Sequence, residues 1–217
     1  MQLTPDFFDC DAQHLAKKLL GKIIRRQYHN QWLAARIIET EAYYLHDRGS
    51  HASLGYTDKR KALFMPAGTI YMYYARGKDS LNISCQGEGN AVLIKSAIFH
   101  CDEKCHSHSL KIMQSLNPQI SGQPRMASKL CAGQTLLCRA LDIKVKDWDQ
   151  QAFKRNQLFI DDIGYSVTSI IQTTRLGIPH DRDEHLMYRF IDEADARHCS
   201  KNPLTQRKPN FIRLNNE

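Results

Sequence analysis

The chain has 217 residues, of which 42% are hydrophobic and 24% are charged, a profile typical of one globular domain and not of a disordered chain. Lysine and arginine outnumber aspartate and glutamate by 30 to 23, which gives a formal net charge of +7. This excess is compatible with a nucleic-acid partner and equally with a plain basic surface.

No stretch is long and apolar enough to cross a bilayer, and residues 1–6 have neither the basic nor the apolar region of a secretion signal. We therefore expect a cytoplasmic protein without membrane contact, associated with the nucleoid if it is bacterial. The seven cysteines are odd in number and irregularly spaced, so we expect reduced thiols. We also expect a single domain over residues 1–217 and a monomer.

In chain order, residues 11–20 come first, with leucines at helical spacing before Gly21, and they predict a helix. Residues 22–28 and 32–43 then indicate the two strands of an antiparallel hairpin. Further strands are predicted at residues 68–75, 81–85, 91–99, 158–163 and 170–175.

The remaining segments are less regular. Residues 45–63 are polar without a clear period, which favours an ordered loop or a short helix. Helices are predicted around residues 106–116 and 126–141, the second interrupted at Gly133, and the chain ends in a polar tail. Strands in the centre with helices around them indicate the α+β class, a single domain with a curved, mostly antiparallel sheet flanked by helices.

Two glutamates continue one face of the long strand at residues 32–43. Because side chains alternate along a strand, Glu39 and Glu41 are expected to share a face with Ile37 and Tyr43. A carboxylate on such a face is rarely buried without a partner or a task, and desolvation would raise its pKa. The alternative is that either glutamate forms an ion pair with a nearby arginine.

The strand at residues 68–75 separates two kinds of side chain. Ile70 and Met72 lie on one face and suit the core, whereas Tyr71 and Tyr73 lie on the other. The tyrosine face could stack on a flat ligand, or its members could be ordinary β-formers.

Cations occur at two further places. Arg76 and Lys78 flank Gly77 at the predicted tip between two strands, where they could meet phosphates or simply be solvated. Lys95 shares a strand face with apolar Leu93 and Ala97, so its ammonium either extends to an anion or lies at the strand end in water.

Three other sequence patterns are weaker indications of function. Residues 86–89 have two glycines of a nucleotide-binding pattern without the third, which indicates a hairpin turn. Residues 100–108 hold His and Cys side chains but no second paired cluster, so we expect no metal there. Residues 180–185, with His180 and His185, are expected to form a solvated loop.

Taken together and in this order, the central motifs resemble the alkyladenine (3-methyladenine) DNA glycosylase family. The resemblance is dense between residues 36 and 95, and weaker at residues 130–141, 175–177 and 189–191. Its motifs are Glu39-Thr40-Glu41-Ala42-Tyr43, His51-Ala52-Ser53, Phe64-Met65-Pro66-Ala67-Gly68-Thr69-Ile70-Tyr71-Met72-Tyr73, Asn82-Ile83-Ser84, Gly87-Glu88-Gly89 and Ala91-Val92-Leu93-Ile94-Lys95.

The resemblance implies a role for each matching residue. It implies that Glu41 is the general base and that Lys95 lies near the attacking water. It implies further that three aromatic side chains sandwich an extruded base and that an amide at the pocket floor disfavours the amine of guanine. The three aromatic side chains are those of Tyr43, His51 and Tyr73, and the amide is that of Asn82.

The sequence departs from the family pattern at two positions. Where the family usually has a tyrosine wedged into the duplex, this chain has Arg76, on a tip that is one residue shorter. An arginine can stack its guanidinium plane and also neutralise phosphate, although its wedge is thinner and less apolar. Where the family more often has an arginine, this chain has Lys95, which lacks the planar fork.

The resemblance implies a cofactor-free and metal-free enzyme that binds double-stranded DNA through residues such as Arg76 and Lys78. It would flip out an alkylated or deaminated purine (3-methyladenine, 7-methylguanine, hypoxanthine or ethenoadenine) and hydrolyse its N-glycosidic bond. No lysine is clearly placed as a Schiff-base nucleophile, so we expect no strand cleavage. The alternatives are a non-catalytic damaged-DNA binder on the same fold, a metal-dependent nuclease and a general RNA-binding protein.

Overall fold

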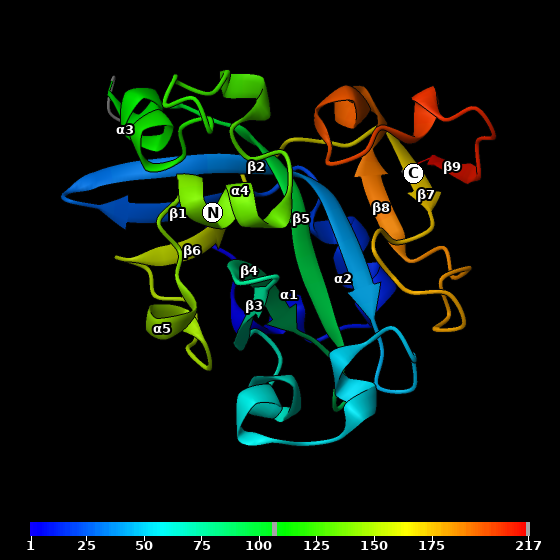
Figure 1. The fold of residues 1–217 in the computed structure, drawn as a ribbon. Helices are drawn as coiled ribbons and strands as arrows, with labels where there is room; N and C mark the ends of the chain where they lie inside the picture. The colour runs from blue at the N-terminus through cyan, green and yellow to red at the C-terminus, as the bar shows by residue number, and fades with distance from the viewer. Residues whose placement is uncertain (106–107, 216–217) are drawn as a thin grey trace.

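Across residues 1–105 and 108–215, which the computed structural model describes, nine strands form one open antiparallel sheet (Figure 1). The strands are β1 Ile23–Tyr28, β2 Gln31–Tyr43, β3 Ile70–Ala75, β4 Lys78–Ser84, β5 Ala91–Phe99, β6 Leu158–Asp161, β7 Ser169–Thr173, β8 Arg189–Asp192 and β9 Phe211–Asn215. Their main path runs β3-β4-β5-β2-β8-β7-β9, while β1 pairs with β2 and with β6.

Short helices cover both faces of this sheet. The α-helices are α1 Pro5–Phe8, α2 Ala12–Leu19, α3 Ser109–Leu116, α4 Gln134–Ala140 and α5 Val145–Trp148. The 3-10 helices are η1 His51–Leu54, η2 Asp58–Phe64, η3 Ala127–Lys129, η4 Glu193–His198 and η5 Pro203–Thr205. In Figure 1, α2 lies behind β2, whereas α3 and α4 lie in front of the sheet. The α+β class with helices around a mostly antiparallel sheet is therefore confirmed.

The helix α2 shows how the sequence builds the back of the core. Asp11 caps it, because its side chain accepts hydrogen bonds from the backbone N–H groups of Gln13 and His14. Leu15 and Leu19 recur on one face and are completely buried against the sheet. The predicted helix at residues 11–20 is thus confirmed.

The central β-meander agrees with the sequence prediction. The β1–β2 hairpin turns at His29 and Asn30, which both have positive φ, as a tight two-residue hairpin turn requires. The β3–β4 and β4–β5 pairs follow, and residues 86–89 form the predicted turn. The polar segment at residues 45–63 contains η1 and η2, so the short-helix alternative is correct there.

The sequence predicts a polar tail at the end of the chain, but the structure has the strands β8 and β9 there. The strand β8 has only four residues and lies beside β2, while β9 forms the edge next to β7. Both termini of β8 are charged, yet Arg189 is completely buried and Asp192 nearly so. Each charge is compensated by a partner far away in the sequence, Glu39 and Arg36 respectively, which no local pattern shows.

A double irregularity interrupts the pairing of β2 with β5. Ile37 pairs with Ala97, Glu39 with Ser96 and Thr40 with Ile94, so Ile38 is an extra residue in β2 and Lys95 is an extra residue in β5. Bulges of this kind redirect side chains. The alternation of side chains along β2, which predicted that both glutamates share a face with Ile37, is therefore broken at this point.

Two composition-based expectations can be compared with the structure. All seven cysteines are free thiols, as expected. Among the helices of the described residues, none has the length and apolar character that a membrane span needs.

Candidate active site

A pocket of about 830 Å³ opens beside the C-terminal half of β2. Its walls come from segments that are far apart in the sequence. These are β2, η1, the β3–β4 hairpin, β5, the start of α4 and the loop at residues 176–182. A volume of this size is within the range of pockets that hold small molecules, so a single nucleobase with its sugar fits it.

Aromatic rings line one side of the pocket. Tyr71 and Tyr73 on β3 stack with 5.7 Å between ring centroids, and His51 meets Tyr73 edge-on at 4.2 Å. The Nδ1 atom of His51 lies 2.9 Å from the hydroxyl of Tyr71. Because His51 and Tyr73 touch, a flat ligand cannot enter between them and has to lie on the surface that they form together.

Tyr43 provides another ring at the end of β2. The guanidinium of Arg175 covers one face of this ring at 4.6 Å from its centroid, and Tyr43 also lines the pocket. Rings from three elements therefore line the pocket: Tyr43 on β2, His51 on η1 and Tyr73 on β3. Such an arrangement suits a planar ring system.

The carboxylate of Glu41 lies at the base of the pocket, behind Tyr43 and Lys95. It is completely buried and does not itself reach the pocket surface. The Tyr43 hydroxyl donates to Oε2 at 2.7 Å, and the backbone N–H of Leu176 donates to Oε1 at 3.1 Å. The ammonium of Lys95 lies 3.2 Å from Oε1 and 3.3 Å from Oε2.

These partners determine the charge of Glu41. Burial acts to raise the pKa of its carboxyl, but the Lys95 ammonium, the Tyr43 hydroxyl and the Leu176 N–H together lower it below the ordinary 4.5. The expectation of a raised pKa is therefore wrong, because the sequence does not show the three donors. Glu41 is an ionised carboxylate at neutral pH.

Lys95 reaches Glu41 because of the bulge in β5. As the extra residue between Ser96 and Ile94, it points its side chain into the pocket, where 12% of the side chain is exposed. Of the two alternatives left open by the sequence, extension to an anion is the one observed.

His51 is kept neutral near pH 7. Its partial burial lowers its pKa below 6.5, and the positive charges of Arg60 and Arg182 lower it further. A neutral ring does not repel a cationic ligand. Asn82 on β4 is buried and lines the pocket, and its amide nitrogen donates to the backbone oxygen of Tyr71 at 3.1 Å.

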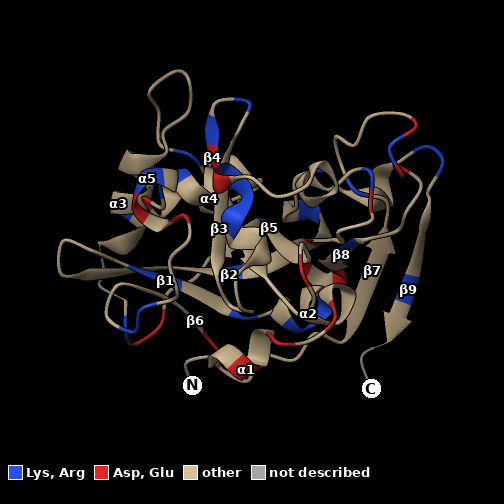
Figure 2. Ribbon diagram, turned by 90° about the horizontal axis from the view of Figure 1, so that it is seen from below, with Lys and Arg blue, Asp and Glu red and all other residues tan. Residues whose placement is uncertain are grey.

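Arg76 and Lys78 lie at the mouth of the pocket. Arg76 and Gly77 both have positive φ and form the two-residue turn between β3 and β4, where Ala75 pairs with Lys78. Figure 2 shows this hairpin projecting from the body of the molecule with Lys and Arg colouring at its end. Both side chains are exposed and also line the pocket rim.

The loop after β7 is a part of the pocket that no sequence motif predicts. Leu176, Ile178 and Pro179 line the pocket from the loop after β7, together with Arg182. Residues 180–185 were predicted as a solvated loop, and His180 is indeed 86% exposed. The neighbouring Arg175-Leu176-Gly177 had been noted only as a weak part of the family resemblance.

Glu39 has a structural environment that differs from that of Glu41. It is completely buried, pairs with Arg189 at 2.6 Å and accepts hydrogen bonds from Ser200 and Ser96. The alternative of an ion pair with arginine thus holds for Glu39, whereas Glu41 pairs with a lysine beside the pocket.

Among the described residues, no group of three or more His, Cys, Asp or Glu side chains is arranged to hold a metal ion. His100 lies 3.4 Å from Asp102, and the Cys105 thiol donates to the backbone oxygen of His100. His106 lies outside the described residues.

An open antiparallel sheet with a ring-lined pocket over an ionised carboxylate is an arrangement suited to a class of proteins that bind a flat ring next to a buried acid. The sequence comparisons narrow this class. The model of the methylpurine-DNA glycosylase (MPG) family matches residues 6–196. The chain therefore belongs to this family of DNA-repair glycosylases, which confirms the resemblance found in the sequence.

Individual relatives cover nearly the whole chain. A protein of Pseudomonas fluorescens (strain Pf0-1) is 61% identical over 93% of this chain and 87% of its own length. One of Pseudomonas aeruginosa (strain PAO1) is 60% identical over 93% of this chain and 84% of its own length. One of Clostridium botulinum (strain Langeland) is 32% identical over 90% of this chain and 98% of its own length. Each is provisionally named a 3-methyladenine DNA glycosylase.

Proposed function

We propose that residues 1–217 form one base-excision glycosylase domain that hydrolyses the N-glycosidic bond of a damaged purine in double-stranded DNA. The observation that supports it best is the ionised Glu41 behind a pocket whose walls carry Tyr43, His51 and Tyr73. The proposed substrates are alkylated or deaminated purines: 3-methyladenine, 7-methylguanine, hypoxanthine and ethenoadenine.

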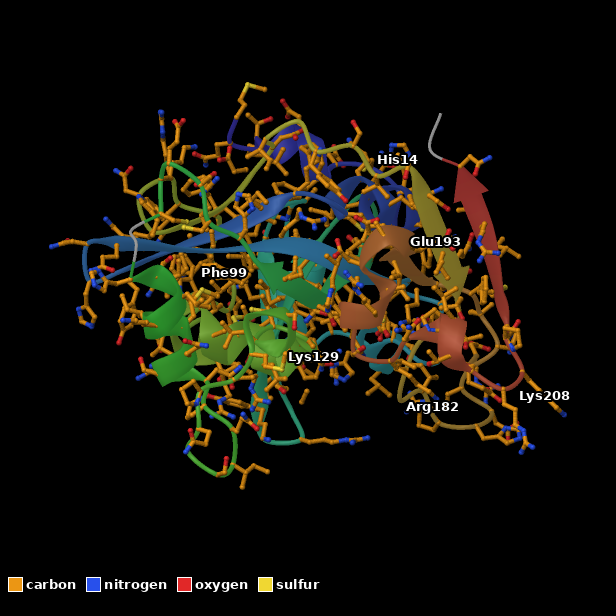
Figure 3. All side chains as sticks on the ribbon, turned by 90° about the horizontal axis from the view of Figure 1, so that it is seen from above. His14, Phe99, Lys129, Arg182, Glu193 and Lys208 are labelled. Carbon is orange, nitrogen blue, oxygen red and sulfur yellow. The ribbon has the colours of Figure 1, made fainter. Side chains whose placement is uncertain are left out.

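The basic residues at the mouth support a DNA-binding face. Figure 3 labels Lys129, Arg182 and Lys208 on one side of the molecule and His14 on the opposite side. Arg182 lines the same pocket as Arg76 and Lys78, from the loop after β7. Phosphates on both sides of an extruded nucleotide would contact these cations, and much of the affinity would come from counterion release.

Selectivity would arise in two steps. A damaged base pairs and stacks poorly, so its extrusion costs less free energy than that of a normal base. In the pocket, the electron-rich faces of Tyr43 and Tyr73 would favour a cationic alkylated purine, and neutral His51 would not oppose it. Asn82 would contact the edge of the base.

The chemistry would take place at Glu41. Since Lys95 and Tyr43 separate the carboxylate from the pocket, entry of the nucleotide would shift the flexible Lys95 side chain and let one water reach Glu41. Glu41 would take a proton from this water as it attacks C1′, and its negative charge would stabilise the positive charge that develops on the sugar. The products would be the free base and an abasic site.

The test uses duplexes that hold a single hypoxanthine or a single 3-methyladenine analogue. Base release is followed by chromatography, and binding is measured on the same duplexes. Wild-type protein should release base, whereas Glu41→Gln should bind the duplex and release none. Binding without release by the wild type would favour the alternative of a non-catalytic damage binder, and metal chelation that abolishes release would favour a nuclease-like metal enzyme.

A further inference from the structure

Residues 197–215, here called the basic segment, follow the part of the chain that the family model matches, which ends at residue 196. The basic segment contains five lysine and arginine residues and no aspartate or glutamate. All five are exposed: Arg197, Lys201, Arg207, Lys208 and Arg213. Arg213 forms an ion pair with Glu193, whereas the other four form none with any residue that the structure describes. The segment therefore presents unneutralised positive charge to the solvent.

Buried contacts fix the start of the basic segment. The Arg189 guanidinium donates to the backbone oxygen of Lys201 at 2.6 Å. Ser200 donates to the Glu39 carboxylate through its backbone N–H at 2.9 Å and through its hydroxyl at 2.8 Å. Glu39 and Arg189 are both completely buried and pair with each other. Because a buried ion pair contributes little net stability by itself, its clearest effect here is to hold Ser200 and Lys201 in place.

The end of the basic segment is also fixed. The Thr173 hydroxyl donates to the backbone oxygen of Asn210 at 2.6 Å, and β9 then pairs with β7 along the edge of the sheet (Figure 1). Between the two attachment points, Arg207 and Lys208 lie on an exposed loop after η5. A loop that is attached at both ends loses less conformational entropy on binding than a free tail loses.

The basic segment faces the side of the molecule that carries pocket residues. Figure 3 labels Lys208 on the same side as Arg182 and Lys129, with His14 on the opposite side. Arg182 lines the pocket, and the Lys129 ammonium donates to the backbone oxygen of Arg197 at 2.8 Å. Positive charge therefore continues on one side of the molecule from the pocket to the basic segment.

We propose that the basic segment binds the phosphate backbone of the duplex that flanks the damaged nucleotide. This inference rests on the proposed function, since a nucleotide extruded into the pocket brings the flanking duplex across the same side of the molecule. Double-stranded DNA carries one negative charge about every 1.7 Å along its axis, and lysine and arginine bind such a row of phosphates without reading the bases. The basic segment therefore adds affinity for damaged and undamaged DNA alike.

The test compares the double variant Arg207→Gln/Lys208→Gln with the control Lys17→Gln/Lys18→Gln on α2. Both variants lower the net charge by the same amount, and α2 carries His14 on the side opposite to Lys208 (Figure 3). Affinity for an undamaged DNA duplex and for an RNA duplex is measured by fluorescence anisotropy over a range of salt concentrations. Circular dichroism and urea unfolding check that each variant is folded.

On DNA, Arg207→Gln/Lys208→Gln should reduce the slope of log affinity against log salt concentration by about two, and the control should change it much less. Shortening the duplex on one side of a lesion should weaken binding by the wild type more than binding by this variant. An equal slope change in the control, or a change on RNA alone, would overturn the proposal.

Base release by the wild type from a hypoxanthine duplex is measured in parallel, so that the two proposals are tested separately. A wild type that releases no base overturns the proposed function, and the slopes on undamaged DNA still report on the basic segment. A wild type that releases base, together with an unchanged slope for Arg207→Gln/Lys208→Gln, overturns only the role of the basic segment.

Discussion

The guanidinium of Arg175 lies over the ring of Tyr43 and is held there by the carboxylate of Asp47. Arg175 also donates to the backbone oxygen of Ala42, and its neighbour Leu176 donates to Glu41. A single buried ion pair therefore joins the loop after β7 to the end of β2 and determines where the Tyr43 ring and the Glu41 carboxylate stand.

Loss of this ion pair should be costly. Arg175→Met leaves the buried Asp47 without its partner, and breaking such a pair costs roughly 3–5 kcal/mol of the free energy of unfolding. Urea unfolding measures this loss. The double variant Arg175→Met/Asp47→Leu should recover part of it, and a loss that stays the same in both variants would contradict a role for the unpaired charge.

The pH dependence of base release should follow the pKa of Glu41. The proposed mechanism needs the Glu41 carboxylate, whose folded pKa lies below 4.5. Release should therefore persist at neutral pH and fall only as the pH drops below the ordinary glutamate range. Tyr43→Phe removes one donor to the carboxylate, so its pKa should rise and the acid limb should move to higher pH. Single-turnover release between pH 3 and 7 measures the shift, and an unmoved limb would contradict it.

The hairpin tip should contribute to binding through charge. Arg76→Ala and Lys78→Ala should each reduce the slope of log affinity against log salt concentration by about one, since each would remove one proposed phosphate contact. Lys17→Ala on α2 is the control, because α2 carries His14 on the side opposite to Arg182 (Figure 3). An equal slope change in the control would indicate that the effect is one of net charge only.

Acid should weaken the fold through Asp161. Burial acts to raise the pKa of this carboxyl, but Lys104, the N-terminal ammonium and Arg25 lower it from 3.8 to about 2. A lowered folded pKa contributes stability that is present above the unfolded value and is lost as the pH falls through the folded one. Urea unfolding at pH 5 and pH 3 should therefore show a drop for the wild type.

Asp161→Asn provides the matched variant for this measurement. It should be less stable than the wild type at pH 5, because Arg25 loses one carboxylate, and it should lose less on acidification. A wild-type loss that is no larger than that of Asp161→Asn would contradict the assignment.

The sequence predicted the parts of this fold that local patterns encode. Alternating side chains located β2 and β3, and polar and glycine-containing turns located the hairpins. It did not predict β8, because the buried charges of Arg189 and Asp192 are compensated by Glu39 and Arg36, which lie some 150 residues away in the chain. Such a segment becomes a strand only because its charged residues pair with residues that are distant in the sequence.

The candidate site also has a part that the sequence predicts and a part that it does not. The structure brings Tyr43, His51, Tyr73, Asn82 and Lys95 together around one pocket, as the family resemblance implied. The bulge at Lys95 and the Leu176 donor were not predictable, since neither has a residue signature of its own. Together with the Tyr43 hydroxyl, these two features reversed the expected direction of the Glu41 pKa.

The segments that form the pocket walls are far apart in the sequence, and this has a consequence while the protein is being translated. Tyr43 emerges from the ribosome early, but the loop that holds Leu176 and Arg182 emerges only after four-fifths of the chain has been made, and β8 follows it. A nascent or truncated polypeptide that lacks this late segment would have an open-sided cleft and an unanchored Tyr43. Partial translation products should therefore be unable to excise bases from the genome.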